Sequence, residues 1–462
     1  MIQAFLSLAA NAPDAPALIE GERGNVISRA ALLSRADQLA TELTASGIRA
    51  GDVVAVQLPN STDFVACFLA STKLNFVFAP IDRDAPETEV AAVLGHFSIK
   101  GFVYRTDRNA RACSIARRIV HERPRLPAGA RMIKLTSGST GMPKAIVCSE
   151  ANLIADATNI CSTMGITPND LNLGAIPFSH SYGFANLVLP LVLQGTPIVV
   201  SNDYLPLSTI ALCNVHRCTV VPLIPMVFEH LAALPKEDGE LATVRTFISA
   251  GAPLTAPTSR RFRERFGADI HTFYGCSEVG GITYDRRGAA VERGTVGTPL
   301  DDVHLELDRQ TQRLSIRSGS VALGYLLDSS HYQPLDGVFT TDDLVDIVAG
   351  DEVVLTGRAG DLINTASKKV NPREVEQVIL QIDGVREVKV FGAPAGARGE
   401  VVAAAVVADP DITREQIREF CRERLSSHKV PRIVKLIEQI PVDERGKVKR
   451  AALAELRSLR DR

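Results

Sequence analysis

The sequence of 462 residues has no tryptophan, and aromatic residues make up only 5% of it. It also has no apolar run close to the ~18 residues that a helix needs to cross a bilayer. The strongest apolar stretch, LVLPLVL, is short and is interrupted by Pro190. The first residues, MIQAFLSLAANAPDAP, place no basic residue before their short apolar run, which argues against a secretory signal peptide. We therefore expect a cytoplasmic protein with no membrane span.

The sequence also lacks an excess of charge of either sign. Its 51 basic and 53 acidic side chains nearly balance, which argues against a nucleic-acid-binding protein. The eight cysteines are scattered, without a C-x-x-C pair. Cys213, His216 and Cys218 come closest to the spacing of metal ligands, but no fourth donor follows nearby in the sequence. We therefore expect buried thiols in a reducing compartment rather than a zinc site.

The patterns that are present predict an α/β protein of more than one domain. A length of 462 residues exceeds what one compact core usually accommodates. Amphipathic helical patterns at 30–43, 61–72 and 151–164 alternate with buried-strand patterns such as VVAVQL and FVFAPID, which predicts a sheet covered on both faces. Residues 314–348 are typical of a β-rich region. The arginine-rich residues 104–131 are expected to form an exposed loop or helix.

A second, smaller domain is predicted after Arg358. Helical patterns at 372–381 and 414–425 alternate with the strand patterns VREVKVFGA, VVAAAVVAD and IVKLI. This α+β segment of about a hundred residues has the size of a small domain. We therefore expect a large N-terminal α/β body with a β-rich subdomain over residues 1–358, and a small α+β domain over residues 359–462.

The densest chemical signal is the string KLTSGSTGMPKAI, at residues 134–146. Its small residues allow the backbone to approach an anion closely, and their N–H and hydroxyl groups can line a phosphate chain. It is not a Walker loop, because Pro143 stands where the glycine of a GK pair would be. The candidate phosphate-binding residues are Thr136, Ser137, Gly138, Ser139, Thr140, Gly141 and Lys144.

This string resembles the phosphate-binding loop of the AMP-forming adenylating enzymes, the superfamily of acyl- and aryl-CoA synthetases, peptide-synthetase adenylation domains and luciferases. Ala145 departs from the pattern, because the family usually has glycine after the lysine. Further elements resemble the family in the same order, and the likeness covers essentially the whole chain. They are SAGAPL at 249–254, YGCSE at 274–278, FTTDD at 339–343, GRAGD at 357–361 and PVDERGKVKR at 441–450.

The resemblance implies a role for each matched residue of the nucleotide site. Tyr274 would stack on adenine, and Gly251 would lie against the same ring. Ser277, in place of the family's threonine, would contact the α-phosphate. Glu278 would bind Mg²⁺, a hard cation that prefers oxygen ligands.

The resemblance also implies how the ribose and the reacting groups are held. Asp342 would accept both ribose hydroxyls, with Thr341 in place of the usual glycine, and Arg358 would contact the ribose as well. Lys447 would bridge the substrate carboxylate and the α-phosphate. Residues 359–462 would act as a mobile lid, and Gly360 stands at the family's hinge position.

The reaction implied by the resemblance is ATP-dependent activation of a carboxylic acid to acyl-AMP, followed by transfer to a thiol. ATP, Mg²⁺ and coenzyme A are therefore the expected cofactors. Ser367 replaces the family glycine that lines the pantetheine tunnel, so an enzyme that loads a carrier protein or stops at the adenylate is an alternative. A degenerate nucleotide-binding regulator is a further alternative, favoured if the departures at Ala145, Thr341 and Ser367 impair the chemistry.

The acid itself is only partly defined. The peptide-synthetase domains of the family bind the substrate amino group with an aspartate shortly after residues 178–182, and the segment SYGFANLVLP has no acidic residue, so the resemblance argues against an amino acid as substrate. His180 matches the family histidine at the acid pocket, although a buried structural histidine is an equal interpretation. Apolar residues that could line a pocket for a fatty or aromatic acid are Tyr182, Phe184, Ile224, Met226 and Val279.

Overall fold

The computed structural model describes residues 1–21, 23–106, 113–120, 122–136, 144–365, 368–394 and 400–440. They belong to two compact units, which are described separately. The first comprises residues 1–305, 316–339 and 350–352, and the second comprises residues 306–315, 340–349 and those from 353 onward. The predicted boundary after Arg358, between a body and a moving domain, stays a prediction.

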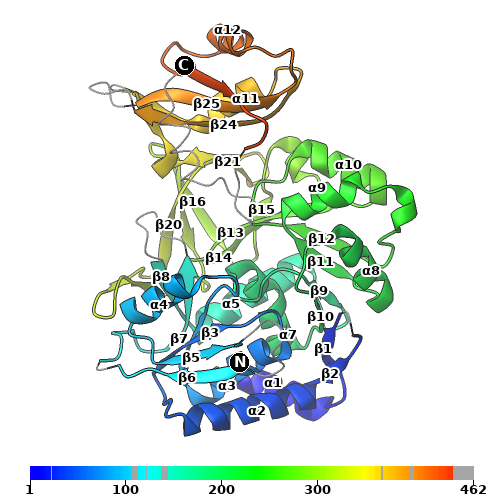
Figure 1. Cartoon of the computed structure of the whole chain (residues 1–462), viewed down its shortest axis with the longest axis vertical. Helices are drawn as coiled ribbons and strands as arrows, with labels where there is room; N and C mark the ends of the chain where they lie inside the picture. Colours follow the sequence, from blue (N-terminus) through cyan, green and yellow to red (C-terminus); the bar gives the residue numbers. More distant parts are fainter. Residues whose placement is uncertain are drawn as a thin grey trace. The chain divides into compact units, whose positions relative to one another are not determined.

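The first unit contains two large sheets (Figure 1). The nine-stranded sheet has the order β15-β14-β13-β12-β11-β9-β10-β1-β2. Its strands from β13 through β12, β11, β9 and β10 to β1 pair in parallel, and antiparallel strands close both edges. The strands are β1 (Pro16–Glu20), β2 (Val26–Ser28), β9 (Asn172–Gly174), β10 (Ile198–Val200), β11 (Val220–Leu223), β12 (Thr246–Ser249), β13 (Ile270–Cys276), β14 (Gly280–Tyr284) and β15 (Thr298–Pro299).

The eight-stranded sheet of the first unit has the order β19-β18-β8-β7-β4-β3-β5-β6. Its strands β5, β3, β4 and β7 are parallel, whereas β8 returns antiparallel to β7. The predicted phosphate loop connects β7 to β8. The strands are β3 (Val53–Gln57), β4 (Val77–Pro80), β5 (Gly101–Tyr104), β6 (Ser114–Arg117), β7 (Ala130–Thr136), β8 (Lys144–Ser149), β18 (Gly324–Leu326) and β19 (Tyr332–Pro334).

Helices cover these sheets and share their cores. Every residue of α3 from Asp63 to Thr72 is buried, so this helix is enclosed on all sides. Its Phe68 ring packs edge-on against Phe184, with centroids 4.8 Å apart. In Figure 1, α8, α9 and α10 lie beside β11–β13. The helices are α1 (Ile2–Asn11), α2 (Arg29–Ala45), α3 (Thr62–Leu74), α4 (Glu87–His96), α5 (Glu150–Met164), α8 (Pro206–His216), α9 (Pro225–Ala233) and α10 (Ala256–Phe266), with short turns η2 (Lys236–Asp238) and η3 (Ala290–Arg293).

An irregular helical segment follows the PFSH sequence. It consists of α6 (Ser181–Gly183), a turn of π-helix, η1 (Phe184–Val188), and α7 (Leu189–Gln194). Pro190 has no N–H to donate and its ring would collide with the carbonyl four residues earlier, so a regular α-helix is disfavoured there. The π-turn widens the helix just before this proline, close to the candidate site.

The described residues of the second unit form smaller sheets and the helices α11 and α12. Most of the four-stranded sheet, ordered β16-β17-β20-β21, and all of the three-stranded sheet, β24-β25-β26, belong to it. Pro372 opens α11 at the helix start, where its missing N–H costs nothing. The elements are β16 (His304–Asp308), β17 (Arg313–Arg317), β20 (Val338–Val348), β21 (Glu352–Arg358), η4 (Ala359–Asp361), β22 (Ile363–Thr365), β23 (Lys368–Val370), α11 (Pro372–Ile379), β24 (Val385–Pro394), β25 (Glu400–Ala408), α12 (Arg414–Arg424) and β26 (Ile433–Leu436).

The predicted α/β class is confirmed, with helices at all five predicted positions. One local prediction was wrong, because the arginine-rich segment contains the strand β6 rather than only loop or helix. β6 pairs antiparallel with β5 and forms the edge of its sheet. Arginine is tolerated there because an edge strand exposes side chains and backbone to water.

Candidate active site

Glu278 lies in the turn between β13 and β14, where other candidate residues meet it. The Tyr325 hydroxyl donates a hydrogen bond to Oε1 of Glu278 at 3.1 Å. The backbone carbonyl of Glu278 accepts from the N–H of Ala322 at 2.8 Å. Lys144, the first residue of β8, holds its Nζ atom 5.7 Å from the centre of the Tyr325 ring. The structure therefore brings together the predicted phosphate-binding lysine and the predicted metal ligand, with Tyr325 between them.

The PFSH segment reaches the same turn. The Ser181 hydroxyl donates to the hydroxyl of Ser277 at 2.9 Å. The Nε2 atom of the preceding residue, His180, lies 3.1 Å from Oδ2 of Asp82. Asp82 lies two residues after the end of β4, and the His180 and Asp82 side chains are 29% and 27% exposed. His180 is thus neither fully buried nor isolated, and a carboxylate orients its ring.

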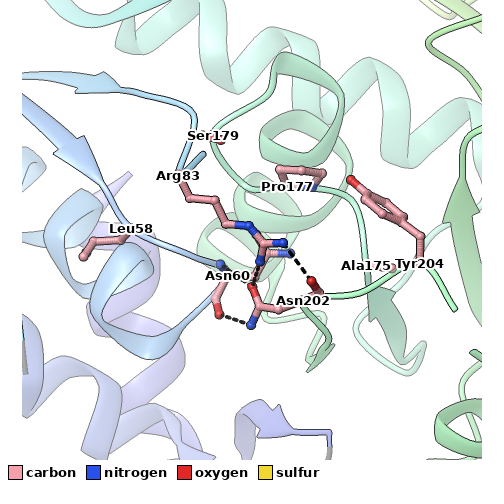
Figure 2. Close-up of a pocket in the computed structure, with 8 residues that line it drawn as sticks. All are labelled: Leu58, Asn60, Arg83, Ala175, Pro177, Ser179, Asn202 and Tyr204. Atoms are coloured by element: carbon pink, nitrogen blue, oxygen red, sulfur yellow. Dashed lines mark hydrogen bonds between the residues drawn. The ribbon is translucent and has the colours of Figure 1, made fainter. Parts of the chain in front are cut away.

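Asn60 holds the loop that follows β9 and ends at His180. Its buried side chain donates to the carbonyls of Gly174, Ile176 and Ser201 and accepts from the N–H of Phe178 at 2.7 Å. Figure 2 shows the small pocket beside it, where Arg83 and Asn202 approach Asn60. Arg83 donates to the Asn202 side-chain and backbone oxygens, so this polar network ties the end of β3 to the loops of the other sheet. The pocket is lined by Leu58, Asn60, Arg83, Ala175, Pro177, Ser179, Asn202 and Tyr204.

The predicted apolar lining lies beside the ends of β11 and β12. The Tyr182 hydroxyl donates to the carbonyl of Ile248 at 3.0 Å, and its ring centre is 5.9 Å from that of Phe273. Burial raises the pKa of Tyr182 well above its usual value, so the phenol stays neutral. Phe184 and Val279 are buried, whereas Ile224 and Met226 are half-buried.

Gly251 and Tyr274 stand at the ends of neighbouring strands. Gly251 follows β12 with φ +87°, a left-handed conformation that favours glycine. A side chain would find space, since the nearest atom to an added Cβ is 3.6 Å away, so backbone conformation is the constraint there. Tyr274 is half-buried near the end of β13.

In the second unit, Arg358, a predicted ribose ligand, forms an ion pair with Asp343, the residue after the predicted ribose ligand Asp342. Nε of Arg358 donates to Oδ1 of Asp343 at 2.6 Å. Asp342 instead forms an ion pair with Arg313, and its side chain is 78% exposed against 12% for Asp343. Counted from Phe339, the pattern aromatic–x–T–G–D ends at Asp343, which places Asp342 at the glycine position.

Several predicted residues lie outside the described part of the chain. These are Ser137, Gly138, Ser139, Thr140, Gly141, Ser367 and Lys447. The backbone of Thr136 is described as the last residue of β7.

Sequence reasoning missed Asp82, Tyr325 and Asp343. Asp82 had a usable signal, because it is the first carboxylate after a buried parallel strand, where sites commonly form. Asp343 could have been found by counting the pattern from Phe339. Nothing in the sequence singles out Tyr325.

A family model described as AMP-binding enzyme matches residues 5–326, and its C-terminal-domain model matches residues 374–447. The chain belongs to the AMP-binding enzyme family. It is 26% identical to a feruloyl-CoA synthase of Amycolatopsis over 94% of each chain, and 25% identical to a sulfoacetate–CoA ligase of Cupriavidus necator over 96% and 95%. Among solved structures, ATP-bound MatB from Rhodopseudomonas palustris is 26% identical, with a TM-score of 0.82 over 98% of both chains.

These findings confirm the predicted superfamily and the predicted enzyme class, an AMP-forming acid–thiol ligase. Among the residues that the structure describes, no helix is long and apolar enough to cross a membrane.

Proposed function

We propose that the protein converts a fatty or aromatic carboxylic acid and coenzyme A into a thioester through an acyl-AMP intermediate. The relatives named as acid–CoA ligases match nearly full length in both directions, which supports coenzyme A as the acceptor. The single structural observation that carries the proposal is the meeting of Lys144, Tyr325 and Glu278 at the turn after β13.

A thiol cannot displace an oxygen of a free carboxylate, so that oxygen must first become part of a good leaving group. The carboxylate attacks the α-phosphorus of ATP and pyrophosphate departs. A thiol then attacks the acyl carbon, and AMP leaves with one oxygen of the acid. The protein's contribution is positioning and charge stabilisation, because phosphoryl transfer needs little covalent help.

In this proposal the residues around Glu278 hold the polyphosphate end of ATP. Lys144 supplies a positive charge to the phosphates, and Tyr325 orients Glu278. The described residues contain no cluster of three metal-binding side chains. A single carboxylate still fits Mg²⁺, which commonly uses one or two protein carboxylates together with substrate phosphates and water. When bound, the ion would neutralise charge on the phosphates.

Asp343 and Arg358 are proposed to bind the ribose hydroxyls in place of the pair Asp342 and Arg358. A carboxylate held by a guanidinium is a strong, oriented acceptor for two hydroxyl groups. Lys447 is proposed to contact the substrate carboxylate and the α-phosphate, on the resemblance of its segment to the family alone.

His180 is proposed to face the substrate acid, with its ring oriented by Asp82. The apolar residues Tyr182, Phe273 and Val279 support a substrate with an apolar body.

Pyrophosphate release with ATP, magnesium and a panel of acids tests the proposal. The panel contains fatty acids of increasing length and substituted benzoic and cinnamic acids, each with and without coenzyme A. Mass spectrometry of the products should show a CoA thioester for the acids that release pyrophosphate. Acyl-AMP that accumulates despite coenzyme A would favour carrier loading or an adenylate-only enzyme, and no pyrophosphate with any acid would favour the regulator.

A further inference from the structure

Ser181 and Ser277 meet where the segment of the proposed acid site touches the turn of the proposed metal site. The Ser181 hydroxyl donates to Oγ of Ser277 at 2.9 Å, and both residues are half-buried. Ser181 directly follows His180, which is proposed to face the acid. Ser277 directly precedes Glu278, the proposed metal ligand. The proposed roles of the neighbouring residues do not use Ser181.

The backbone that carries Ser181 is held in place from two sides. The buried Asn60 side chain forms hydrogen bonds with the loop between β9 and α6. Within α6, Gly183 approaches the same loop so closely that an added Cβ would lie 2.2 Å from the carbonyl oxygen of Pro177. Ser181 is the first residue of α6, so its hydroxyl is presented from a fixed backbone.

Ser277 lies in the turn between β13 and β14, and its hydroxyl needs a neighbour to define its direction. The two sides of this turn are close, because an added Cβ at Gly275 would lie 2.3 Å from the carbonyl oxygen of Gly280. A serine side chain has three staggered positions for its hydroxyl and no branch at Cβ that would restrict χ1. The hydrogen bond from Ser181 therefore favours one position of the Ser277 hydroxyl.

The direction of this hydrogen bond leaves the Ser277 proton available. A hydroxyl group has one proton to donate and two lone pairs that can accept. The non-bridging oxygens of the α-phosphate of ATP carry no proton at neutral pH, so a hydroxyl that binds one of them must be the donor. Ser277 accepts from Ser181 and can still donate, and a hydroxyl that accepts a hydrogen bond is polarised into a better donor.

We propose that Ser181 is a positioning residue for adenylation, whose hydroxyl orients that of Ser277 so that Ser277 donates a hydrogen bond to an oxygen of the α-phosphate. This role rests on the proposed function and on the predicted contact of Ser277 with that phosphate, because Ser181 acts through Ser277. Neither serine forms or breaks a covalent bond. The pair stabilises the charge that develops on the α-phosphate as the carboxylate attacks.

A double-mutant cycle tests whether Ser181 acts through Ser277. Pyrophosphate release at varied ATP and the ligand-free melting temperature are measured for Ser181→Ala, Ser277→Ala and the double variant. In Ser181→Ala, kcat/KM for ATP should fall about 3- to 10-fold, the scale of one neutral hydrogen bond, and the melting temperature should stay within about 2 °C. Ser277→Ala should lose more activity, because it also removes the bond to the phosphate. The double variant should lose no more than Ser277→Ala, because no hydroxyl is left to orient.

The α-thio analogues of ATP give a readout that a purely structural role of Ser181 would not change. Each of the two diastereomers replaces one non-bridging α-phosphate oxygen by sulfur, which is a weaker hydrogen-bond acceptor. For each, the kcat/KM with ATP is divided by the kcat/KM with the analogue. For one diastereomer this ratio should be lower in Ser181→Ala than in the wild type, because the substitution has already weakened the bond that sulfur weakens.

Ser179→Ala is the matched control. Ser179 is half-buried in the loop before α6, but it lines the small pocket beside Arg83 (Figure 2). This variant should keep kcat/KM and both ratios of the wild type.

Three results would overturn the role of Ser181. They are a double variant with a clearly lower kcat/KM than Ser277→Ala, wild-type kcat/KM in either single variant, and a Ser181→Ala protein that loses activity while both ratios stay unchanged. A wild-type protein that releases no pyrophosphate with any acid would instead refute the proposed function.

Discussion

Replacing Asp343 by asparagine tests which of two adjacent aspartates binds the nucleotide. Asp343→Asn removes the charge and keeps an acceptor of the same size next to Arg358, whereas Asp342→Asn makes the same change one residue earlier. If Asp343 accepts the ribose hydroxyls, its neutralisation weakens two charge-assisted hydrogen bonds and Asp342→Asn weakens none.

The size of the effect follows from the geometry of each side chain. Loss of one charge-assisted hydrogen bond costs about 1.5–3 kcal/mol, which is about a 10- to 150-fold increase in KM for ATP. Stability should change little, because the Arg358 side chain is 62% exposed and can return to water. An ion pair with such an exposed partner contributes about 1 kcal/mol or less. Asp342, at 78% exposure, should give less than about a twofold change in KM.

The assay is pyrophosphate release at varied ATP with a saturating acid, together with the melting temperature of each variant without ligand. A KM for ATP that rises for Asp342→Asn and not for Asp343→Asn would refute the reasoning from the Arg358 contact. It would also support the match to the family in which Thr341 stands at the glycine position and Asp342 at the aspartate position.

Three further predictions concern other residues. Glu278→Ala should lower adenylate formation at least about 100-fold while the ligand-free melting temperature stays within about 2 °C, and wild-type activity would contradict its role at the metal. Burial alone would raise the pKa of Asp170, but bonding to Arg245 outweighs burial and lowers this pKa to about 2. The charged Asp170 therefore contributes its full stabilisation of the fold above pH ~4, and this contribution is lost as the pH falls toward ~2. Urea unfolding of Asp170→Asn should therefore show lower stability at pH 7 and a shallower loss across that window; an unchanged acid limb would count against the pair. Lys447→Ala should slow adenylation about 10²–10³-fold and spare thioester formation from supplied acyl-AMP, whereas Lys449→Ala should affect adenylation much less; the reverse pattern would mean that the segment is misaligned.

Predictions from periodicity succeeded where one local rule dominated. The helix predicted at 151–164 was found as α5 (Glu150–Met164), because Ser149 forms a capping box with Asn152 and Gly165 ends the helix in a left-handed conformation. The strand β6 was missed because four residues at a sheet edge carry no alternation that a sequence pattern could detect.

Candidate site residues that belong to short motifs can be found from the sequence more easily than the residues that contact them. Glu278 and Lys144 lie in recognisable strings, but Tyr325 meets them only because β18 pairs with β8, a contact between residues far apart in the sequence. The proposal of Asp343 in place of Asp342 depends on which side of β20 faces Arg358, because adjacent residues of a strand point to opposite faces.

The most direct test of the account follows the oxygen of the acid. The acid that gives the fastest pyrophosphate release is prepared with both carboxylate oxygens as ¹⁸O and incubated with ATP, magnesium and coenzyme A. Because the carboxylate attacks the α-phosphorus, the AMP formed should carry one ¹⁸O atom, and the thioester should retain the other. Formation of ADP, or AMP without the label, would contradict an acyl-adenylate intermediate and with it the proposed reaction.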